Sequence, residues 1–460
     1  MLKPPFYPPR RFTLKVTRRS RKSKVQVVAD ATGVVSHAGS ALLVELSDRL
    51  GLTRALGEAM ADTRERRSVH DPGVVLRDLA VMLADGGDCL SDLGALRDQA
   101  ALFGPVASGR TAWRTITAAD EAHLRAIRAA RGRARASAWA AGARPKRLIL
   151  DIDATLVSSH SDKQGAEPTY KRGFGFHPLL CYLDGSDEAL SGVLRPGNAG
   201  ANTAADHIAV LIDAVDQLPG VGEDPAAHDI LVRADSGGAT HAFLDAVSDI
   251  GMGFSVGFDL TAPVRRAVLA LPEGAWTAAV TQDGGERAGA WVAEIFPDLR
   301  GWPPGTRAIC RRERPHPGAQ LSFSDADGHR FQTFITNQDG EDVVCLEACH
   351  RAHARVEDRI RAAKDSGLRN LPFHARAHNA LWLELVLIAQ DLTSWTQTLT
   401  LTGDLARAEP KRLRYRLLHI AAKLTRSGRR MRLHLPADWP WAEALVAAFA
   451  RLRALPTPAA

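Results

Sequence analysis

Two aspartates lie two positions apart in "LILDIDATLV" (148–157), a stretch otherwise typical of a buried strand. Because alternate side chains of a strand share a face, Asp151, Asp153 and Thr155 point one way and the apolar residues between them point the other. A buried, unpaired carboxylate is energetically costly, so these acids must pair with cations, bind a metal or reach solvent. A salt bridge to a neighbouring arginine is the alternative to a functional site.

A second acid, Asp235, follows the strand-like run in "ILVRADSGG" at the point where a turn begins. Acids at the carboxyl ends of strands lie where open α/β sheets form their sites. The alternative is that Asp235 caps the helix expected to start near Thr240.

A third candidate lies in "HRAHARVEDRIRAAK", where a helix would place five side chains on one stripe, at offsets of three, four, four and three: His350, His353, Glu357, Arg361 and Lys364. Side chains on such a stripe can contact the same ligand. The alternative is a solvated, charged helix face with pairs between successive turns.

Three acids on two strands and a helix fit a site for two divalent ions. Carboxylate oxygens suit Mg²⁺, with Mn²⁺ also possible. Two ions about 4 Å apart can activate a nucleophile and stabilise the leaving oxygen in phosphodiester displacement. Glu384, in an apolar helix, is a rival third acid, but Glu357 is preferred because its stripe is cationic, as a DNA-facing helix should be.

Two other functions compete with this one. A nuclease or phosphoesterase could bind zinc or manganese through His350, His353 and Glu357, which also share a helix face. A DNA-binding protein without catalysis would need only the basic segments. Sequence alone does not show whether this copy is active.

The elements that must position the acids follow an α/β order. Three strands, a helix, a strand, a helix and a strand (βββαβαβ) indicate a mixed sheet that begins with an antiparallel meander. The predicted segments are a basic arm (1–37), a helical DNA-binding region (38–145), the first part of the core (146–262), a β-rich insertion (263–345), core helices carrying the third acid (346–405) and a basic helical C-terminal region (406–460).

Composition narrows the class of protein further. The chain has 460 residues, a net charge of +7 and a pI near 9.3, which favours a polyanionic partner. The longest apolar stretch, 379–395, contains Glu384, Gln390 and Asp391, so it suits a buried helix better than a membrane span. The N-terminal residues lack the apolar core of a secretory signal, and the five cysteines form no CxxC pair. We therefore expect a cytoplasmic protein with reduced thiols.

At this point the sequence resembles the DDE transposases of bacterial insertion sequences, in the group named for insertion sequence 1380. The resemblance covers most of the chain. Its carriers are "LDIDATLV", "YKRGFGFHPLL", "LRPGNAGA", "VRADSGG" and "HRAHARVEDRIRAAKDSGLRNLPF".

The resemblance implies a ribonuclease H-like core in which Asp153, Asp235 and Glu357 hold two Mg²⁺ ions, with Asp151 as the alternative to Asp153. A related group shows Tyr-x2-Arg-x3-Glu-x6-Lys on the glutamate helix. Glu357 and Lys364 match that spacing, and Lys364 would touch DNA. Histidines at positions 350 and 353 replace the tyrosine and arginine, so the resemblance assigns neither of those two roles to this sequence.

The implied activity is cleavage of DNA at the transposon ends, followed by attack of the freed 3′-OH on target DNA. The implied partner is double-stranded DNA, both terminal inverted repeats and target, in the bacterial nucleoid. Joining two ends implies a homodimer. Lys171, Arg172 and Arg233 are candidate phosphate clamps, with salt bridges as the alternative. Trp276 or Trp291 could stack on an extruded base, although core positions are the commoner use of tryptophan.

Overall fold

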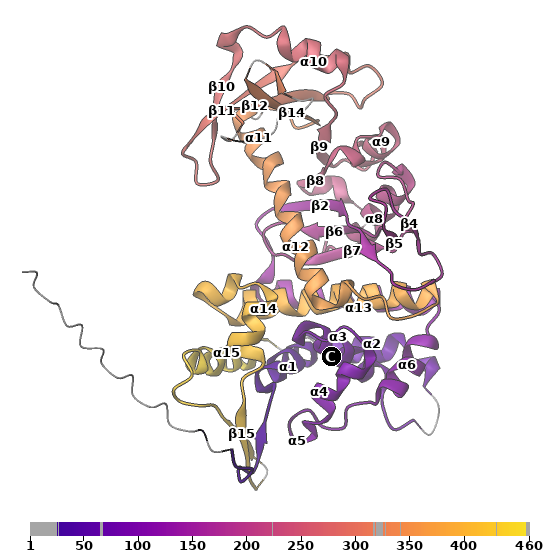
Figure 1. The fold of residues 1–460 in the computed structure, drawn as a ribbon, viewed down its shortest axis with the longest axis vertical. Coiled ribbons are helices and arrows are strands. Elements are labelled where there is room, and N and C mark those ends of the chain that lie inside the picture. Colours follow the sequence, from indigo (N-terminus) through magenta and orange to yellow (C-terminus); the bar gives the residue numbers. More distant parts are fainter. Residues whose placement is uncertain are drawn as a thin grey trace, which may run out of the picture.

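The fold is mixed α/β, built on one large sheet with helices around it (Figure 1). The structure, a computed structural model, describes residues 25, 27–64, 68–222, 224–315, 318, 325–326, 328–340, 342–428 and 430–456. The N-terminal part of the basic arm, residues 1–24, lies outside the described residues. The helical character predicted for 38–145 is confirmed by seven α-helices in that segment.

The strand that carries the first acid is central in the sheet. β2 (Leu148–Ala154) pairs in parallel with β8 (Ile230–Ala234) and antiparallel with β6 (Leu179–Leu183). β9 (Gly253–Phe258) continues the sheet beyond β8, and β7 (Ala189–Val193) continues it beyond β6. Leu150 and Ile152 of β2 are almost fully buried. The order predicted from sequence is therefore found as β2, β6, β7, α8, β8, α9 and β9.

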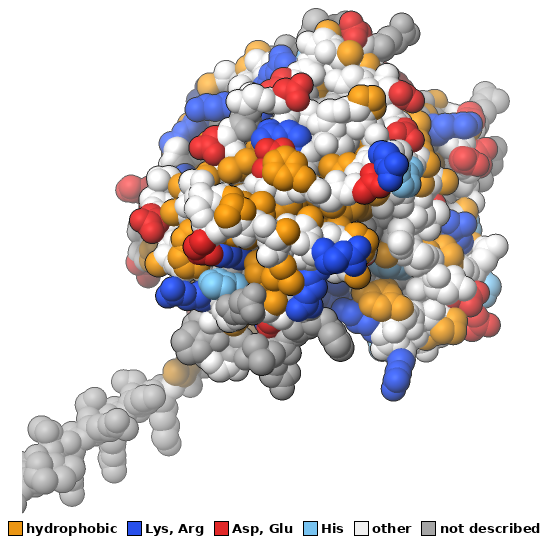
Figure 2. Space-filling model, turned by 90° about the horizontal axis from the view of Figure 1, so that it is seen from above, with side chains coloured by type: hydrophobic (Ala, Val, Ile, Leu, Met, Phe, Trp, Pro, Cys, Tyr) orange, Lys and Arg blue, Asp and Glu red, His pale blue; other side chains and the backbone are white. Residues whose placement is uncertain are grey.

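The insertion extends this same sheet instead of forming one of its own. Its strands are β10 (Thr277–Val280), β11 (Glu286–Ile295), β12 (Arg307–Glu313), β13 (Asp325–Ala326) and β14 (His329–Thr336). β14 pairs antiparallel with β9, so the sheet runs β10-β11-β12-β14-β9-β8-β2-β6-β7, with β13 beside β14. The insertion forms the upper end of the molecule in Figure 1. Seen from that end, acidic, basic and hydrophobic side chains are interspersed (Figure 2).

A long buried helix, α13 (Arg376–Thr400), lies between the sheet and the N-terminal helices (Figure 1). It packs against β7 on one side and against α3 (Pro72–Asp85) and α7 (Glu121–Ala138) on the other. The sequence prediction of a buried helix over 379–395 is confirmed. Among the helices that the structure describes, none is long and apolar enough to cross a membrane.

The glutamate helix is a nearly continuous rod made of several short pieces. It comprises α11 (Val343–Arg351), a 3₁₀ turn (Ala352–Arg355), α12 (Val356–Ala363) and a π turn (Lys364–Leu368). In Figure 1 the rod descends from the insertion and crosses in front of the central strands. The remaining α-helices are α1 (Ala41–Arg49), α2 (Leu52–Ala59), α4 (Gly94–Arg97), α5 (Ala100–Phe103), α6 (Gly109–Thr117), α8 (Ala204–Asp216), α9 (His241–Asp249), α10 (Ala262–Leu269), α14 (Pro410–Leu413) and α15 (Ala442–Ala454).

Two sequence predictions about secondary structure are wrong. The single strand expected over "YKRGFGFHPLLCYLDG" is divided at His177–Pro178 between β6 and a small sheet of β3 (Val157–Ser158), β5 (Phe174–Phe176) and β4 (Glu167–Pro168). The C-terminal region is not all helical, because β15 (Ala422–Ser427) and β16 (Arg430–His434) form a hairpin that pairs with β1 (Val34–Val35). Most of the described side chains of this hairpin are exposed or half-buried, and only Ala422 among them is buried.

Candidate functional site

Asp151 lies in a buried cluster of ions. It is opposite Arg233 in the parallel register of β2 and β8, and it is fully buried. Arg233 donates to both of its carboxylate oxygens at 2.8 Å, and Arg359 of α12 donates to Oδ2 at 2.7 Å. Nδ1 of His353 lies 2.9 Å from Oδ1. Burial by itself would raise the pKa of Asp151, but the bonds from His353 and Arg233 outweigh burial and lower it.

The same two arginines also bind Asp184, just after β6. Arg233 lies 2.9 Å and Arg359 2.5 Å from its carboxylate oxygens. Two buried aspartates are thus shared by two buried arginines, one on β8 and one on α12. A buried charge is tolerated when it is paired in this way. The cluster therefore fastens α12 to the middle of the sheet.

Asp153 lies two residues further along β2, where the structure opens. The last register pair of β2 and β8 is Ile152 with Ala234, so the next positions along are Asp153 and Asp235, at the carboxyl ends of two parallel strands. Burial raises the pKa of Asp153 to about 6, and the charges of Asp235 and Glu357 push it in the same direction. His353 and the backbone N–H of Ala154 oppose this rise. The three predicted acids therefore face one region.

Asp235 is exposed and begins a tight turn. Its Oδ1 accepts a hydrogen bond from the backbone N–H of Gly237 at 2.9 Å, which caps the 3₁₀ turn Ser236–Gly238. The helix that follows, α9, is capped by Thr240 without a side-chain bond, so the alternative role of Asp235 as the cap of that helix is wrong. Gly257 of β9 lies directly behind the turn, where a Cβ would come within 2.8 Å of the Ser236 nitrogen.

Glu357 is exposed in the first turn of α12. In the described part of the chain, two groups of His, Cys, Asp or Glu have ligand atoms that all lie within 4.8 Å of one another, and neither contains the three acids. Asp153, Asp235 and Glu357 are therefore close enough for their charges to interact but too widely spaced to share one small ion as they stand.

The predicted stripe along the helix is divided between three environments. His350 stacks on Phe334 with ring centroids 4.2 Å apart, its Nδ1 lies 3.0 Å from Ser255 Oγ, and burial lowers its pKa to about 3. His353 contacts Asp151. Arg361 pairs with Asp358 at 2.9 Å and lines a pocket on the α13 side of the helix.

These placements correct several sequence predictions. Arg233 is 1% exposed and its donors go to Asp151, Asp184 and the carbonyl of Cys349, so the salt-bridge alternative holds and a phosphate clamp does not. His350 is half-buried, its ring stacks on Phe334 and its Nδ1 is engaged with Ser255, so its predicted contact with DNA stays a prediction. The rival metal site is also wrong, because the two histidines bind Ser255 and Asp151 and do not converge with Glu357.

Lys364 lies close enough to Asp153 for their charges to interact, and Lys171 lies close enough to Lys364. Lys364, at the end of α12, is half-buried; burial lowers its pKa, the charge of Lys171 lowers it further, and the charge of Asp153 opposes the decrease. Lys171 and Arg172 are exposed at the turn between β4 and β5. Arg172 has a left-handed backbone conformation, with φ 61°, that shapes this turn. This hairpin brings the positive charge of Lys171 into the neighbourhood of Lys364.

Glu384, the rival third acid, has a structural role at the junction with the N-terminal helices. It is buried in α13, 3.0 Å from Arg131 and 3.4 Å from Arg128 of α7. Asp391, two turns further along α13, lies 2.5 Å from Arg135 of the same helix α7. These pairs join α13 to α7 and leave Glu384 committed to that interface.

The two tryptophans of the insertion are neither fully buried in the core nor fully exposed to solvent. Trp276 and Trp291 are half-buried, and the guanidinium of Arg312 lies between them, 4.4 Å and 5.1 Å from their ring centroids. The prediction that one of them stacks on an extruded base stays a prediction. Arg312 occupies one face of each ring in this structure.

Comparison with known families gives the class of protein. Residues 17–457, nearly the whole chain, match a family model of transposase domains, and the function is that of a DNA transposase. The chain belongs to the family described as "Transposase DDE domain group 1".

Comparisons with individual proteins are less informative. A search of curated proteins finds no match. Among solved structures, the chain is similar to a piggyBac transposase in a synaptic complex with hairpin DNA, with 9% sequence identity, a TM-score of 0.42, and coverage of 82% of this chain and 80% of that chain. Likeness at this level transfers no residue role to this protein.

Proposed function

We propose that Asp153, Asp235 and Glu357 are the catalytic acids of this transposase and hold two divalent ions, Mg²⁺ or Mn²⁺. The observation that carries the proposal is the parallel register of β2 and β8, which places Asp153 and Asp235 next to one another at the carboxyl ends of the two strands; the charge of Glu357 also acts on Asp153. The distance between the three acids fits two ions better than one. If Asp153 binds both ions and the ions lie about 4 Å apart, Asp235 and Glu357 each bind one ion and must be well separated from one another. All donors are carboxylate oxygens, which Mg²⁺ prefers.

Asp153 is the better ligand of the two strand acids. Asp151 is surrounded by two arginines and a histidine, so an incoming cation would have to displace buried guanidinium groups. Asp153 has one backbone donor, on Oδ1, and no cationic partner within ion-pair distance among the described residues. Its raised pKa is the mark of a carboxylate that lacks a cation.

The strand order supports a ribonuclease H-like core. β6 and β7 run antiparallel to their neighbours on one side of β2, and β8 and β9 run parallel to it on the other. The acids then stand on the central strand, on its parallel neighbour and on a helix packed across them. Membership of the insertion sequence 1380 group, and with it a bacterial, nucleoid-associated protein, is proposed from the sequence resemblance alone.

The substrate in this proposal is double-stranded DNA, first the terminal inverted repeats and then the target. Bound divalent ions supply the charge that activates the attacking oxygen and stabilises the leaving oxygen. Lys364, Lys171 and Arg172 bind backbone phosphates beside the acids and align the scissile bond. The Asp151 cluster holds α12, and with it Glu357, in register with β2. Two chains act together, one for each transposon end.

Cleavage of a duplex that carries the transposon end, in the presence of Mg²⁺, tests the proposal. We expect Asp153→Asn, Asp235→Asn and Glu357→Gln each to lower the cleavage rate by at least about 100-fold while DNA binding is retained. Asp358→Asn is the matched control, because Asp358 is the exposed neighbour of Glu357 and pairs with Arg361. Equal cleavage by the wild type and the three variants contradicts the proposal. Binding without cleavage by the wild type favours the inactive DNA-binding alternative.

A further inference from the structure

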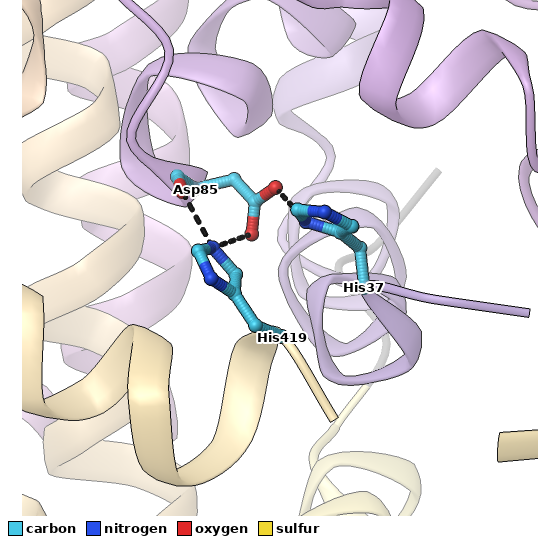
Figure 3. A group of neighbouring side chains, drawn as sticks. All are labelled: His37, Asp85 and His419. Carbon is cyan, nitrogen blue, oxygen red and sulfur yellow. Dashed lines mark hydrogen bonds and ion pairs between the residues drawn. The ribbon is translucent and has the colours of Figure 1, made fainter. Parts of the chain in front are cut away.

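Three side chains from distant parts of the sequence meet at the C-terminal end of α3. His37 precedes the 3₁₀ turn Ala38–Ser40, Asp85 is the last residue of α3, and His419 follows the π turn Arg414–Leu418. The carboxylate of Asp85 lies between the two imidazole rings (Figure 3). His37 Nδ1 is 2.5 Å from Oδ2, and His419 Nε2 is 3.3 Å from Oδ1.

The donor atoms form a set that a transition metal would accept. One atom from each of the three residues lies within 4.8 Å of the other two. Two imidazole nitrogens and one carboxylate oxygen are the ligands of many zinc sites, and borderline metals prefer such a mixture to an all-oxygen set. The rings themselves are 4.5 Å apart and inclined at 51°, so their nitrogens approach the carboxylate from different directions.

The surroundings hold the three ligands in place. Ser40 Oγ donates to Asp85 Oδ1 at 2.6 Å, and the Asp85 side chain is only 4% exposed. His37 has φ 54° and ψ 31°, a left-handed conformation that is unusual for a residue with a Cβ. Its surroundings must maintain that conformation, and such residues are common where a side chain has to be aimed.

The site is open on one side, which leaves room for a fourth ligand. A cavity of about 480 Å³ is lined by His37, Asp85 and His419 together with Met82 and Asp92. Side-chain exposures of 25% for His37 and 41% for His419 give an ion a path from solvent. Three protein ligands with a fourth position for water complete a tetrahedral shell.

We propose that His37, Asp85 and His419 bind one zinc-like transition-metal ion. The ion fastens the segment before α1 and the segment after α14 to the end of α3. It replaces the contacts between the imidazoles and the carboxylate and the 2.8 Å hydrogen bond between His419 Nε2 and the Asp85 backbone carbonyl, which otherwise form a metal-free clamp. The proposal does not depend on the catalytic acids, because the residues and the preferred metal both differ.

Zinc titration of the full-length chain, freed of metal with a chelator, tests this site. The parent protein carries Asp153→Asn and Glu357→Gln so that the acid site does not compete. We expect one equivalent of Zn²⁺ to bind and to raise the thermal midpoint by about 2–4 °C, and both effects to be lost in His419→Ala. His123→Ala is the control: His123 contacts Asp62 and Asp120 through opposite ring nitrogens, which cannot face one ion.

A second measurement needs no variant and so does not depend on how well one folds. X-ray absorption of the Zn²⁺-loaded parent protein should show a shell of nitrogen and oxygen ligands that includes two imidazoles. Binding of less than half an equivalent, binding unchanged in His419→Ala, or a shell without imidazole would each overturn the proposal and leave the three residues as a metal-free clamp.

Discussion

Asp151 of β2 and Arg233 of β8 stand directly opposite one another, and both oxygens of the carboxylate accept hydrogen bonds from the guanidinium at 2.8 Å. One step further along, the same register brings Asp153 beside Asp235 at the ends of the two strands. A single pair of parallel strands therefore supplies a buried ion pair and then a pair of acids without a cation between them. The two aspartates of "LDIDATLV" consequently have different roles.

Exchanging each of these aspartates for asparagine should separate stability from catalysis. Asp151→Asn leaves Arg233 and Arg359 buried without their shared partner, so we expect a loss of about 3–5 kcal/mol in the free energy of unfolding. Asp153→Asn removes a charge that burial disfavours, so stability should be retained or increased. Urea unfolding and DNA cleavage of both variants check this. Similar stability losses in the two variants would contradict the difference in roles.

Stability should fall between about pH 4 and pH 6 because of Asp153. Its pKa rises from 3.8 to about 6 in the folded state, chiefly through burial. Over this window the folded protein keeps a proton that the unfolded chain has released, so the stabilisation is full below pH 4 and is lost by pH 6. Its size is on the order of 3 kcal/mol. The decrease should appear in the difference between the wild type and Asp153→Asn, measured by unfolding titrations without Mg²⁺, because His350 contributes with the opposite sign to the wild-type curve itself.

Asp153→Asn is the control for that pH dependence. Other groups titrate in the same range, including His350, but their contributions are common to both proteins and cancel in the difference. The difference in the free energy of unfolding between wild type and variant should therefore change with pH. Added Mg²⁺ should reduce this pH dependence, because the ion favours the ionised carboxylate of Asp153 in the folded protein. A difference that stays constant from pH 4 to pH 7 would show that Asp153 titrates normally.

The two glutamates considered as third acid should give opposite results with the same substitution. Glu384→Gln breaks buried contacts to Arg131 and Arg128, so it should destabilise the protein by about 3–5 kcal/mol while folded molecules still cleave DNA. Glu357 is exposed, so Glu357→Gln should change stability by no more than about 0.5 kcal/mol and abolish cleavage. Thermal unfolding and single-turnover cleavage distinguish the two. Loss of cleavage in stable Glu384→Gln protein would reverse the assignment.

Lys364 should contact a DNA phosphate. We expect Lys364→Ala to weaken binding uniformly across DNA sequences and to lower the slope of log K against log salt by about 1. Arg361→Ala is the control, since the guanidinium of Arg361 is paired with Asp358 at 2.9 Å. Binding measured at several salt concentrations gives both slopes. A larger change for Arg361→Ala than for Lys364→Ala would contradict the assignment of Lys364 as the phosphate contact.

Much of the fold was predictable because it follows local patterns. The apolar face of 148–157 indicated a central strand, and the spacing in 379–395 indicated a buried helix; both are confirmed. The strand division at Pro178 and the C-terminal hairpin were missed. The hairpin depends on pairing with β1, almost 400 positions away in sequence, which no local pattern records.

The candidate site was predictable in its acids but not in their partners. The role of Asp151 depends on Arg233 and Arg359, which reach it from β8 and α12. The position of Arg233, two residues before Asp235, repeats the spacing of Asp151 before Asp153, and this parallel was the available signal. Arg359 does not lie on the predicted stripe, so the helical spacing gave no indication that it contacts Asp151. The prediction that His350 shares one environment with the rest of the stripe was also wrong, because the ring of His350 stacks on Phe334 of the sheet.

Anomalous scattering from Mn²⁺ in crystals of the protein with a transposon-end duplex tests the central claim most directly. The account predicts two peaks about 4 Å apart, both bound to Asp153, with Asp235 on one ion and Glu357 on the other. Peaks at Asp151 or Glu384, or no peak beside Asp153 when DNA is bound, would contradict it.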